Sequence, residues 1–113
     1  MTKQEKEIKK LREDLTIPNI IKSQLYGLDA NAMGCWGSNN FRGSGAIDPE
    51  HNGQLLFDIS NLKEINQGTI KINLNYSDTY DLWIYGDNKK LIEEYKNIYF
   101  DQLTDIIGEV IGY

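Results

Sequence analysis

The chain has 113 residues and a formal net charge of −5; 40% of its residues are hydrophobic and 11% are aromatic. This size and composition are typical of a single globular domain with one core, and they exclude a chain that is disordered throughout. No apolar run is long enough to span a membrane and the first residues lack a signal-peptide core, so we expect a cytoplasmic protein without a membrane contact.

The charges are distributed unevenly along the chain. Residues 1–14 are nearly neutral, whereas residues 77–113 carry a large excess of acids. Binding to nucleic acid through its phosphates needs clustered Lys and Arg, so we expect no direct nucleic-acid binding. An acidic surface suits a basic protein partner, although acids also simply keep a small domain soluble.

Residues 1–15 are predicted to form a charged helical arm with Ile8, Leu11 and Leu15 on one side. This apolar stripe is narrow, so the arm could dock weakly, pair with another copy or fray. If the protein is a homo-oligomer, we expect the contact at these three residues. Residues 16–113 are expected to form a single α+β domain.

A short core helix is predicted to follow the arm. Thr16 is a favourable N-cap, Pro18 fits the first turn, and Gly27 is a favourable C-terminal stop. The glycine-rich segment 27–53 then favours irregular strands in a bulged hairpin. Within it, Cys35 is expected to be a small half-buried hydrophobic residue. Residues 48–53, which include His51, are expected to form a surface turn.

Alternation of apolar and polar residues predicts the next strands. Leu55, Phe57 and Ile59 alternate with polar neighbours, and residues 69–85 contain two such runs joined by a short polar link, which predicts a β-hairpin. Residues 88–99 fit either a helix or a strand, and we favour a strand because a two-stranded hairpin alone is marginal.

The last predicted element is an amphipathic helix that Asp101 could cap. Its apolar residues share one side and are Leu103, Ile106, Ile107, Val110 and Ile111. The predicted fold class is therefore α+β, with a small antiparallel sheet of about four strands packed against N- and C-terminal helices.

The sequence contains no convincing catalytic or metal-binding constellation. In the glycine-rich segment, Gly43 is followed by Ser44 and Gly45 rather than by the Lys of a phosphate loop. Cys35 and His51 are the single Cys and the single His, which are too few for a structural zinc site and have no orienting partner for catalysis. We therefore expect no enzyme activity, no cofactor and no metal.

A protein-binding surface is the remaining expectation. Trp83 and Tyr85 alternate with Leu82 and Ile84, so they should lie on the outer face of the hairpin, and large aromatic side chains often mark contact surfaces. The residues expected to contact a protein partner are Asp78, Asp81, Trp83, Tyr85, Glu93 and Glu94. The alternatives are that the two aspartates only shape the turn and that a helix or the arm covers Trp83.

Four segments together resemble a group of small uncharacterised proteins of bacteriophages and other mobile elements. The segments are residues 17–27, Asn39-Asn40-Phe41, Asp78-Thr79-Tyr80-Asp81, and residues 98–113 beginning Ile98-Tyr99-Phe100-Asp101. The resemblance implies a small α+β domain of mobile-element origin, which would act in the cytoplasm of a host cell. It does not point to any activity, because none is established for the group.

We therefore expect a non-enzymatic protein that binds a host or phage protein through an acidic, aromatic surface. An inhibitor of a bacterial defence system, of the anti-CRISPR type, is one specific form of this hypothesis. The alternative is a self-associating structural or assembly protein without a role in defence.

Overall fold

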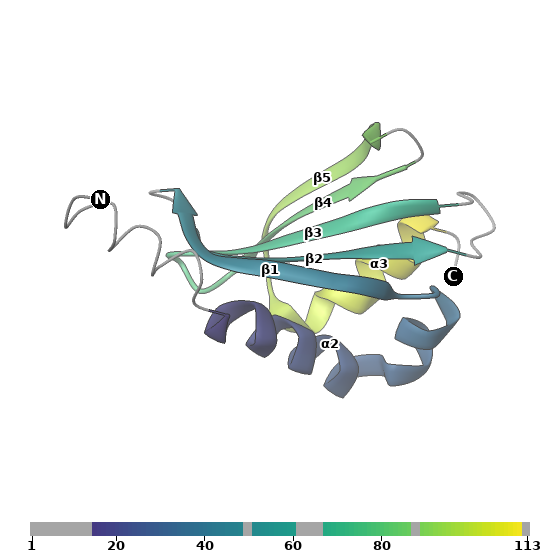
Figure 1. The fold of residues 1–113 in the computed structure, drawn as a ribbon, viewed down its shortest axis with the longest axis horizontal. Helices are drawn as coiled ribbons and strands as arrows, with labels where there is room; N and C mark the ends of the chain where they lie inside the picture. Colours follow the sequence, from purple (N-terminus) through teal and green to yellow (C-terminus); the bar gives the residue numbers. More distant parts are fainter. Residues whose placement is uncertain (1–14, 49–50, 61–66, 87–88, 112–113) are drawn as a thin grey trace.

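A computed structural model describes residues 15–48, 51–60, 67–86 and 89–111 of the chain. These residues form a five-stranded antiparallel sheet in the order β1-β2-β3-β4-β5, with helices α2 and α3 on one of its faces (Figure 1). The α+β prediction is confirmed, with five strands instead of about four. Ile8 and Leu11 of the predicted arm lie outside the described residues, and Leu15 is exposed.

Helix α2 spans Thr16–Cys35; its first segment breaks two residues after the predicted stop at Gly27, and the second segment was not predicted. The backbone leaves helical geometry at Asp29 (φ −160°, ψ 85°) and then resumes it. The Oδ1 atom of Asp29 accepts a hydrogen bond from the Ala32 amide at 3.0 Å, which caps the second helical segment. At the start of α2 the N-cap is Leu15, without a side-chain cap, so Thr16 does not have the predicted capping role.

Gly37 ends α2 and fixes it against the sheet. Its φ of +62° is the left-handed conformation of a helix C-terminus, and the amides of Gly37 and Ser38 donate to the carbonyls of Gly34 and Met33. The Ser60 amide donates to the Trp36 carbonyl at 2.8 Å. Met33 and Trp36 are thereby held in the core, where both are buried.

Strands β1 (Asn39–Asp48) and β2 (His51–Ser60) form the predicted bulged hairpin, with register shifts between Asn39 and Arg42 and between Gly45 and Asp48. The predicted surface turn is wrong at residues 51–53, which belong to β2. The first turn of α2 packs closely on this hairpin. A Cβ atom at Gly43 would lie 2.4 Å from Pro18 Cβ, so only glycine allows this approach.

Strands β3 (Gln67–Asn75) and β4 (Tyr80–Tyr85) confirm the predicted hairpin, and β5 (Leu91–Ile98) confirms that this ambiguous segment is a strand. The side chains that face the helices alternate along the strands, as predicted. The buried apolar members of this sheet face are Leu55, Phe57, Ile59, Ile70, Ile72, Tyr80, Leu82, Ile84 and Ile98.

The chain ends in a short 3-10 helix, η2 (Phe100–Gln102), followed by α3 (Leu103–Ile111). Asp101 lies within η2 and does not cap α3 as predicted; instead the Gln102 side chain accepts a hydrogen bond from the Tyr99 amide at 3.1 Å. Leu103, Ile107 and Ile111 are buried against the sheet and α2. Neither helix in the described ranges has the length and apolar character needed to cross a bilayer.

Candidate functional site

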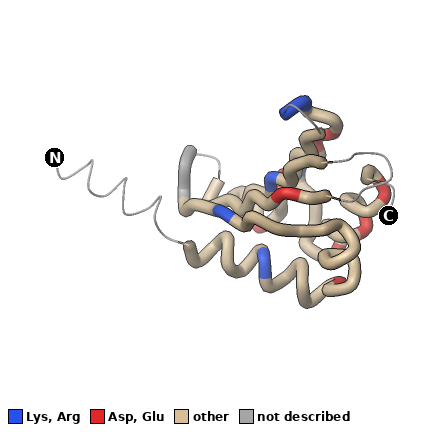
Figure 2. Tube along the Cα trace, turned by 45° about the vertical axis from the view of Figure 1, so that its right-hand side comes forward, with Lys and Arg blue, Asp and Glu red and all other residues tan. Residues whose placement is uncertain are grey.

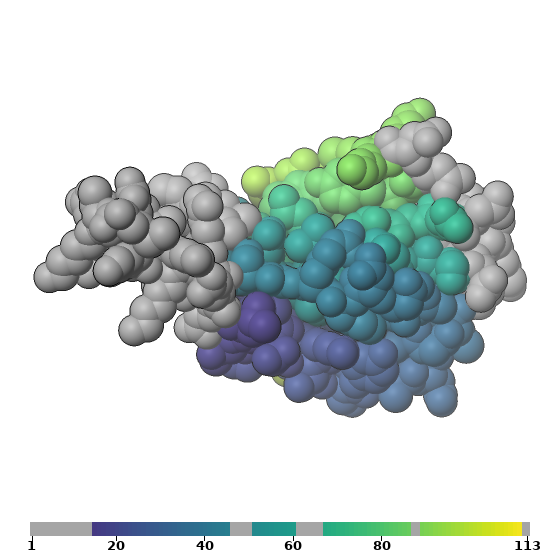
Figure 3. All heavy atoms as spheres, viewed as in Figure 1, coloured from purple at the N-terminus to yellow at the C-terminus, as the bar shows by residue number. Residues whose placement is uncertain are grey.

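The face of the sheet that points away from α2 and α3 is the candidate site, and we call it the open face. No helix among the described residues covers it, and the five strands lie side by side above α2 (Figures 1 and 3). Its side chains come from the residues that alternate with the core. Cross-strand neighbours on it include Lys71 with Trp83 and Trp83 with Glu94.

Trp83 lies on β4, next to Lys71 of the central strand β3, and is partly exposed on the open face. The Nζ atom of Lys71 is 4.9 Å from the centroid of its ring, and the Nζ atom of Lys96 is 5.9 Å from it. The His51 ring meets Trp83 edge-on, with the two centroids 6.1 Å apart. Both lysine distances are within the range of cation–π attraction, so the indole is held in place while part of it stays accessible.

A buried polar network lies beside Trp83 at one end of the open face. The Nε2 atom of His51 donates to Asp81 Oδ2 at 2.8 Å, and Asp81 Oδ1 accepts from the Asn97 amide at 3.1 Å and from Asn75 Nδ2 at 3.2 Å. Burial raises the pKa of Asp81, but these hydrogen bonds and the charge of His51 outweigh burial and lower the pKa below its usual value. Asp81 therefore stays ionised and its two oxygens are occupied.

The same network shapes the turn between β3 and β4. The Asn75 Oδ1 atom accepts hydrogen bonds from the Ser77 amide at 2.9 Å and from Thr79 Oγ1 at 3.0 Å. Asn97, which has a φ of +57°, joins the network through its own Oδ1 atom. Since these contacts of Asp81 and Asn75 lie within the protein, the cluster positions the sheet and the β3–β4 turn.

A second polar cluster, around Asp58, lies at the other end of the open face. The Asp58 carboxylate accepts hydrogen bonds from Thr69 Oγ1 at 2.9 Å, Asn40 Nδ2 at 2.8 Å and Arg42 Nη2 at 3.2 Å. The pKa of Asp58 is below its usual value. Burial raises it, but the three hydrogen bonds and the charge of Arg42 together outweigh burial. The guanidinium of Arg42 is thus engaged within the protein.

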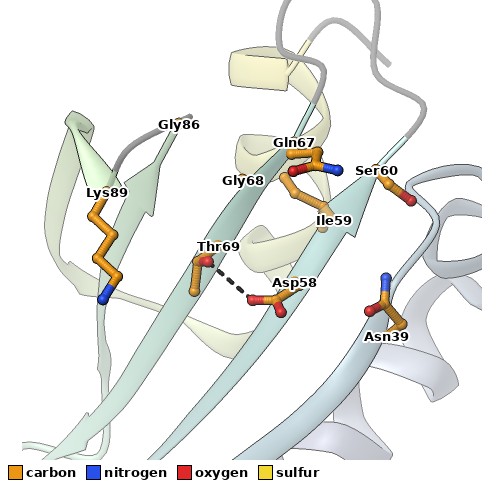
Figure 4. A pocket seen from close by; sticks show the side chains of 9 residues that line it. All are labelled: Asn39, Asp58, Ile59, Ser60, Gln67, Gly68, Thr69, Gly86 and Lys89. Carbon is orange, nitrogen blue, oxygen red and sulfur yellow. Dashed lines mark hydrogen bonds between the residues drawn. The ribbon is translucent and has the colours of Figure 1, made fainter.

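Next to Asp58 is an open cavity of about 400 Å³. Figure 4 shows Lys89, which precedes β5, across the cavity from Asn39 on β1, with the Asp58–Thr69 pair between them. The described residues that line the cavity are polar and apolar in similar measure and include no nucleophile–base pair. Across the described ranges, moreover, no three His, Cys, Asp or Glu side chains are grouped as a metal site would require.

The open face is less acidic than the sequence suggested. Three carboxylates of this face have basic partners: Asp58 pairs with Arg42, Asp81 with His51, and Glu94 with Lys96 at 3.6 Å. In contrast, Lys71 and Lys89 form no ion pair in the described part of the chain. Several acidic positions lie instead around α3, near the C-terminus (Figure 2).

The structure does not bring the six predicted contact residues together on one surface. Trp83, Tyr85 and Glu94 share the open face, and Asp78 is exposed at the tip of the β3–β4 turn. Asp81 is on the same face but buried beneath it. Glu93 lies on the helix side, since its cross-strand neighbour is the core residue Ile84. The pKa of Tyr95 agrees with this position: burial raises it, and the negative charges of Glu93 and of Glu109 on α3 raise it further.

Two further expectations about single residues are wrong. Cys35, expected to be half-buried, is exposed at the end of α2, because the helix continues through it. His51, expected in a surface turn, is buried within β2. A signal for the second correction was present: His51 continues the alternation of Gly53, Leu55, Phe57 and Ile59. A register shift after His51 then brings it to Asp81, which alternation cannot predict.

Comparisons of the chain with protein-family models, with curated proteins and with solved structures give no match.

Proposed function

We propose that this protein is a non-enzymatic binding domain that holds a protein partner on the open face of its sheet. The observation that carries the proposal is the position of Trp83, which is partly exposed on this face and held between Lys71 and Lys96. A pre-positioned tryptophan is a common anchor of protein interfaces, because it contributes a large contact area at a low entropic cost.

The charges of the open face favour a partner segment that carries carboxylates. Asp58, Asp81 and Glu94 already have basic partners, so they attract a basic segment weakly. Lys71 and Lys89 form no ion pair with a carboxylate of the described residues, so they are available to pair with acids of the partner. An acidic partner segment differs from the basic partner that the acidic composition of the sequence suggested. A basic partner would fit the acidic residues around α3 instead.

Capture of the partner from host lysate with matched variants tests the proposal. Trp83→Ala and Lys71→Glu alter the open face, whereas Tyr76→Ala, at an exposed turn position, and Asp105→Lys, at an exposed position of α3, are the controls. We expect the first pair to lose the captured protein and the second pair to retain it. Loss with Asp105→Lys and retention with Trp83→Ala would refute the open face as the contact and would favour a basic partner on α3.

The resemblance to mobile-element proteins makes bacterial defence proteins the first partner class to test. The experiment is a plaque assay in which the protein is expressed in hosts with defined immune systems. Rescue of phage by the wild-type protein, and its loss with Trp83→Ala, would support inhibition through the open face. Absence of rescue in every host would refute the inhibitor hypothesis and leave partner binding as a separate question for the capture experiment.

A further inference from the structure

We propose that two copies of the chain form a symmetric dimer in which the β5 strands pair antiparallel, centred on Tyr95. Strand β5 is the last strand of the sheet, and β4 is its only strand partner within the described residues. Leu91 and Ile92 on it are 45% and 40% exposed. An edge strand presents unpaired backbone donors and acceptors, so a second strand can extend the sheet there.

The charges of β5 are self-complementary in this arrangement: Glu94 and Lys96, which lie 3.6 Å apart within one chain, each also face the opposite charge of the second chain. Glu94 is the cross-strand neighbour of Trp83, and Lys96 Nζ lies 5.9 Å from the same indole, so both charged side chains are on the open face. In an antiparallel pair centred on Tyr95, Glu94 of each copy lies opposite Lys96 of the other. A two-fold axis repeats this opposite-charge pair, and opposite charges at such positions stabilise strand pairing.

The irregularities of β5 limit how long a second strand can pair with it. The β4–β5 register shifts between Tyr80 and Leu82 and again between Ile84 and Tyr85. Glu93, Glu94 and Tyr95, between these shifts, pair regularly with β4. Bulges at strand ends discourage extended edge pairing, so the contact should be short, and the charges of Glu94 and Lys96 select the register centred on Tyr95. Because the pairing uses the β5 edge of both copies, it closes at two chains.

The dimer would also enlarge the surface proposed for partner binding. Joining two five-stranded sheets at β5 makes their open faces continuous. The two Trp83 residues would then lie three strand spacings apart across the sheet, about 14 Å, and would also be offset along the strands. A single partner could contact both, although the dimer itself does not depend on the function proposed above.

Sedimentation velocity of the full chain and of two charge-reversal variants tests the dimer. Glu94→Lys places two lysines opposite each other across the interface, and Lys96→Glu places two glutamates there. We expect the wild type to dimerise and each single variant to dimerise at least roughly tenfold more weakly. An equimolar mixture of the two variants should restore dimers, because lysines of one chain then face glutamates of the other.

The mixture also serves as the control for folding, since two misfolded variants would not restore an interface. The double variant, with both charges exchanged, should dimerise like the wild type. The proposal is overturned if the wild type is monomeric at high concentration, or if both single variants dimerise as strongly as the wild type. It is also overturned if Leu15→Asp abolishes the dimer while the single charge reversals do not, since the contact would then lie at the N-terminal arm.

Discussion

His51 and Asp81 form a buried ion pair that connects β2 to β4 across the intervening strand β3. The Nε2 and Oδ2 atoms are 2.8 Å apart, and both side chains are 8% exposed. The pair holds the end of the open face beside Trp83, so the position of the indole depends on it. Breaking such a pair leaves one buried group without its partner, which costs more than the pair contributes.

Asp81→Asn is therefore expected to lower the free energy of unfolding by about 3 kcal/mol. The variant loses the charge that stabilises His51 and weakens the acceptor of the Asn97 amide. Asp78→Asn, at the exposed turn with a φ of +59°, is the matched control and should change stability by less than about 0.5 kcal/mol, since asparagine tolerates this conformation. Urea unfolding followed by circular dichroism measures both. Equal stability of the two variants would contradict the role given to the ion pair.

Stability is expected to fall in acid because of Asp58 and Asp81. Their pKa values are lower in the folded protein than in the unfolded chain, so the unfolded chain takes up protons first. Their contribution is complete above the unfolded pKa of about 3.9 and is lost as the pH falls through the folded values. The urea midpoint of the wild type should drop below about pH 4. Asp58→Asn should show a smaller drop, and an identical pH profile of the two proteins would refute this assignment.

Two glycines are expected to respond in opposite directions to alanine. At Gly37 the φ is +62° and a Cβ atom would lie 2.5 Å from Ser60 Oγ and 2.9 Å from the Ser60 carbonyl oxygen, so Gly37→Ala should destabilise by about 1–3 kcal/mol. At Gly27, within α2, nothing lies within 4 Å of the added atom. Gly27→Ala should stabilise by about 0.5–1 kcal/mol through helix propensity. Thermal unfolding compares the two, and destabilisation by Gly27→Ala would contradict a helix that continues past this residue.

Cys35 is expected to react with a thiol reagent in the native protein. It is exposed at the end of α2 and no other cysteine is present in the chain, so one thiol should be titrated without denaturant. Ellman's reagent measures this, and Cys35→Ser provides the blank. A thiol that reacts only after urea is added would contradict the exposure of Cys35 at the end of α2.

The strands of this fold could be predicted because their core residues alternate. Ile70, Ile72, Leu82 and Ile84 occupy every second position of two neighbouring strands, and this pattern is independent of distant residues. The segment 91–98 was ambiguous, because the apolar residues of an edge strand need not alternate strictly. Its assignment followed from the need of the β3–β4 hairpin for a further strand.

The second segment of α2 and the polar network could not be predicted, because they depend on contacts between residues that a local sequence pattern does not reveal. Gly27 carries an ordinary stop signal, but the helix continues because Asp29 caps a second segment that brings Met33 and Trp36 into the core. His51 reaches Asp81, 30 residues away, only through the register shift in β2. The candidate surface was therefore predictable only in part. Alternation placed Trp83 and Tyr85 on the open face, whereas the ion pairs of its carboxylates could be seen only in the three-dimensional structure.

Site-specific photo-crosslinking in the host cell tests most directly whether the open face holds a partner. A photoreactive amino acid at Lys71 probes the open face, and the same residue at Glu109, exposed on α3, probes the opposite side. We predict a crosslinked partner protein from position 71, its loss when Trp83→Ala is added, and none from position 109. Crosslinks from position 109 alone, or a position-71 product that persists with Trp83→Ala, would contradict binding through the open face.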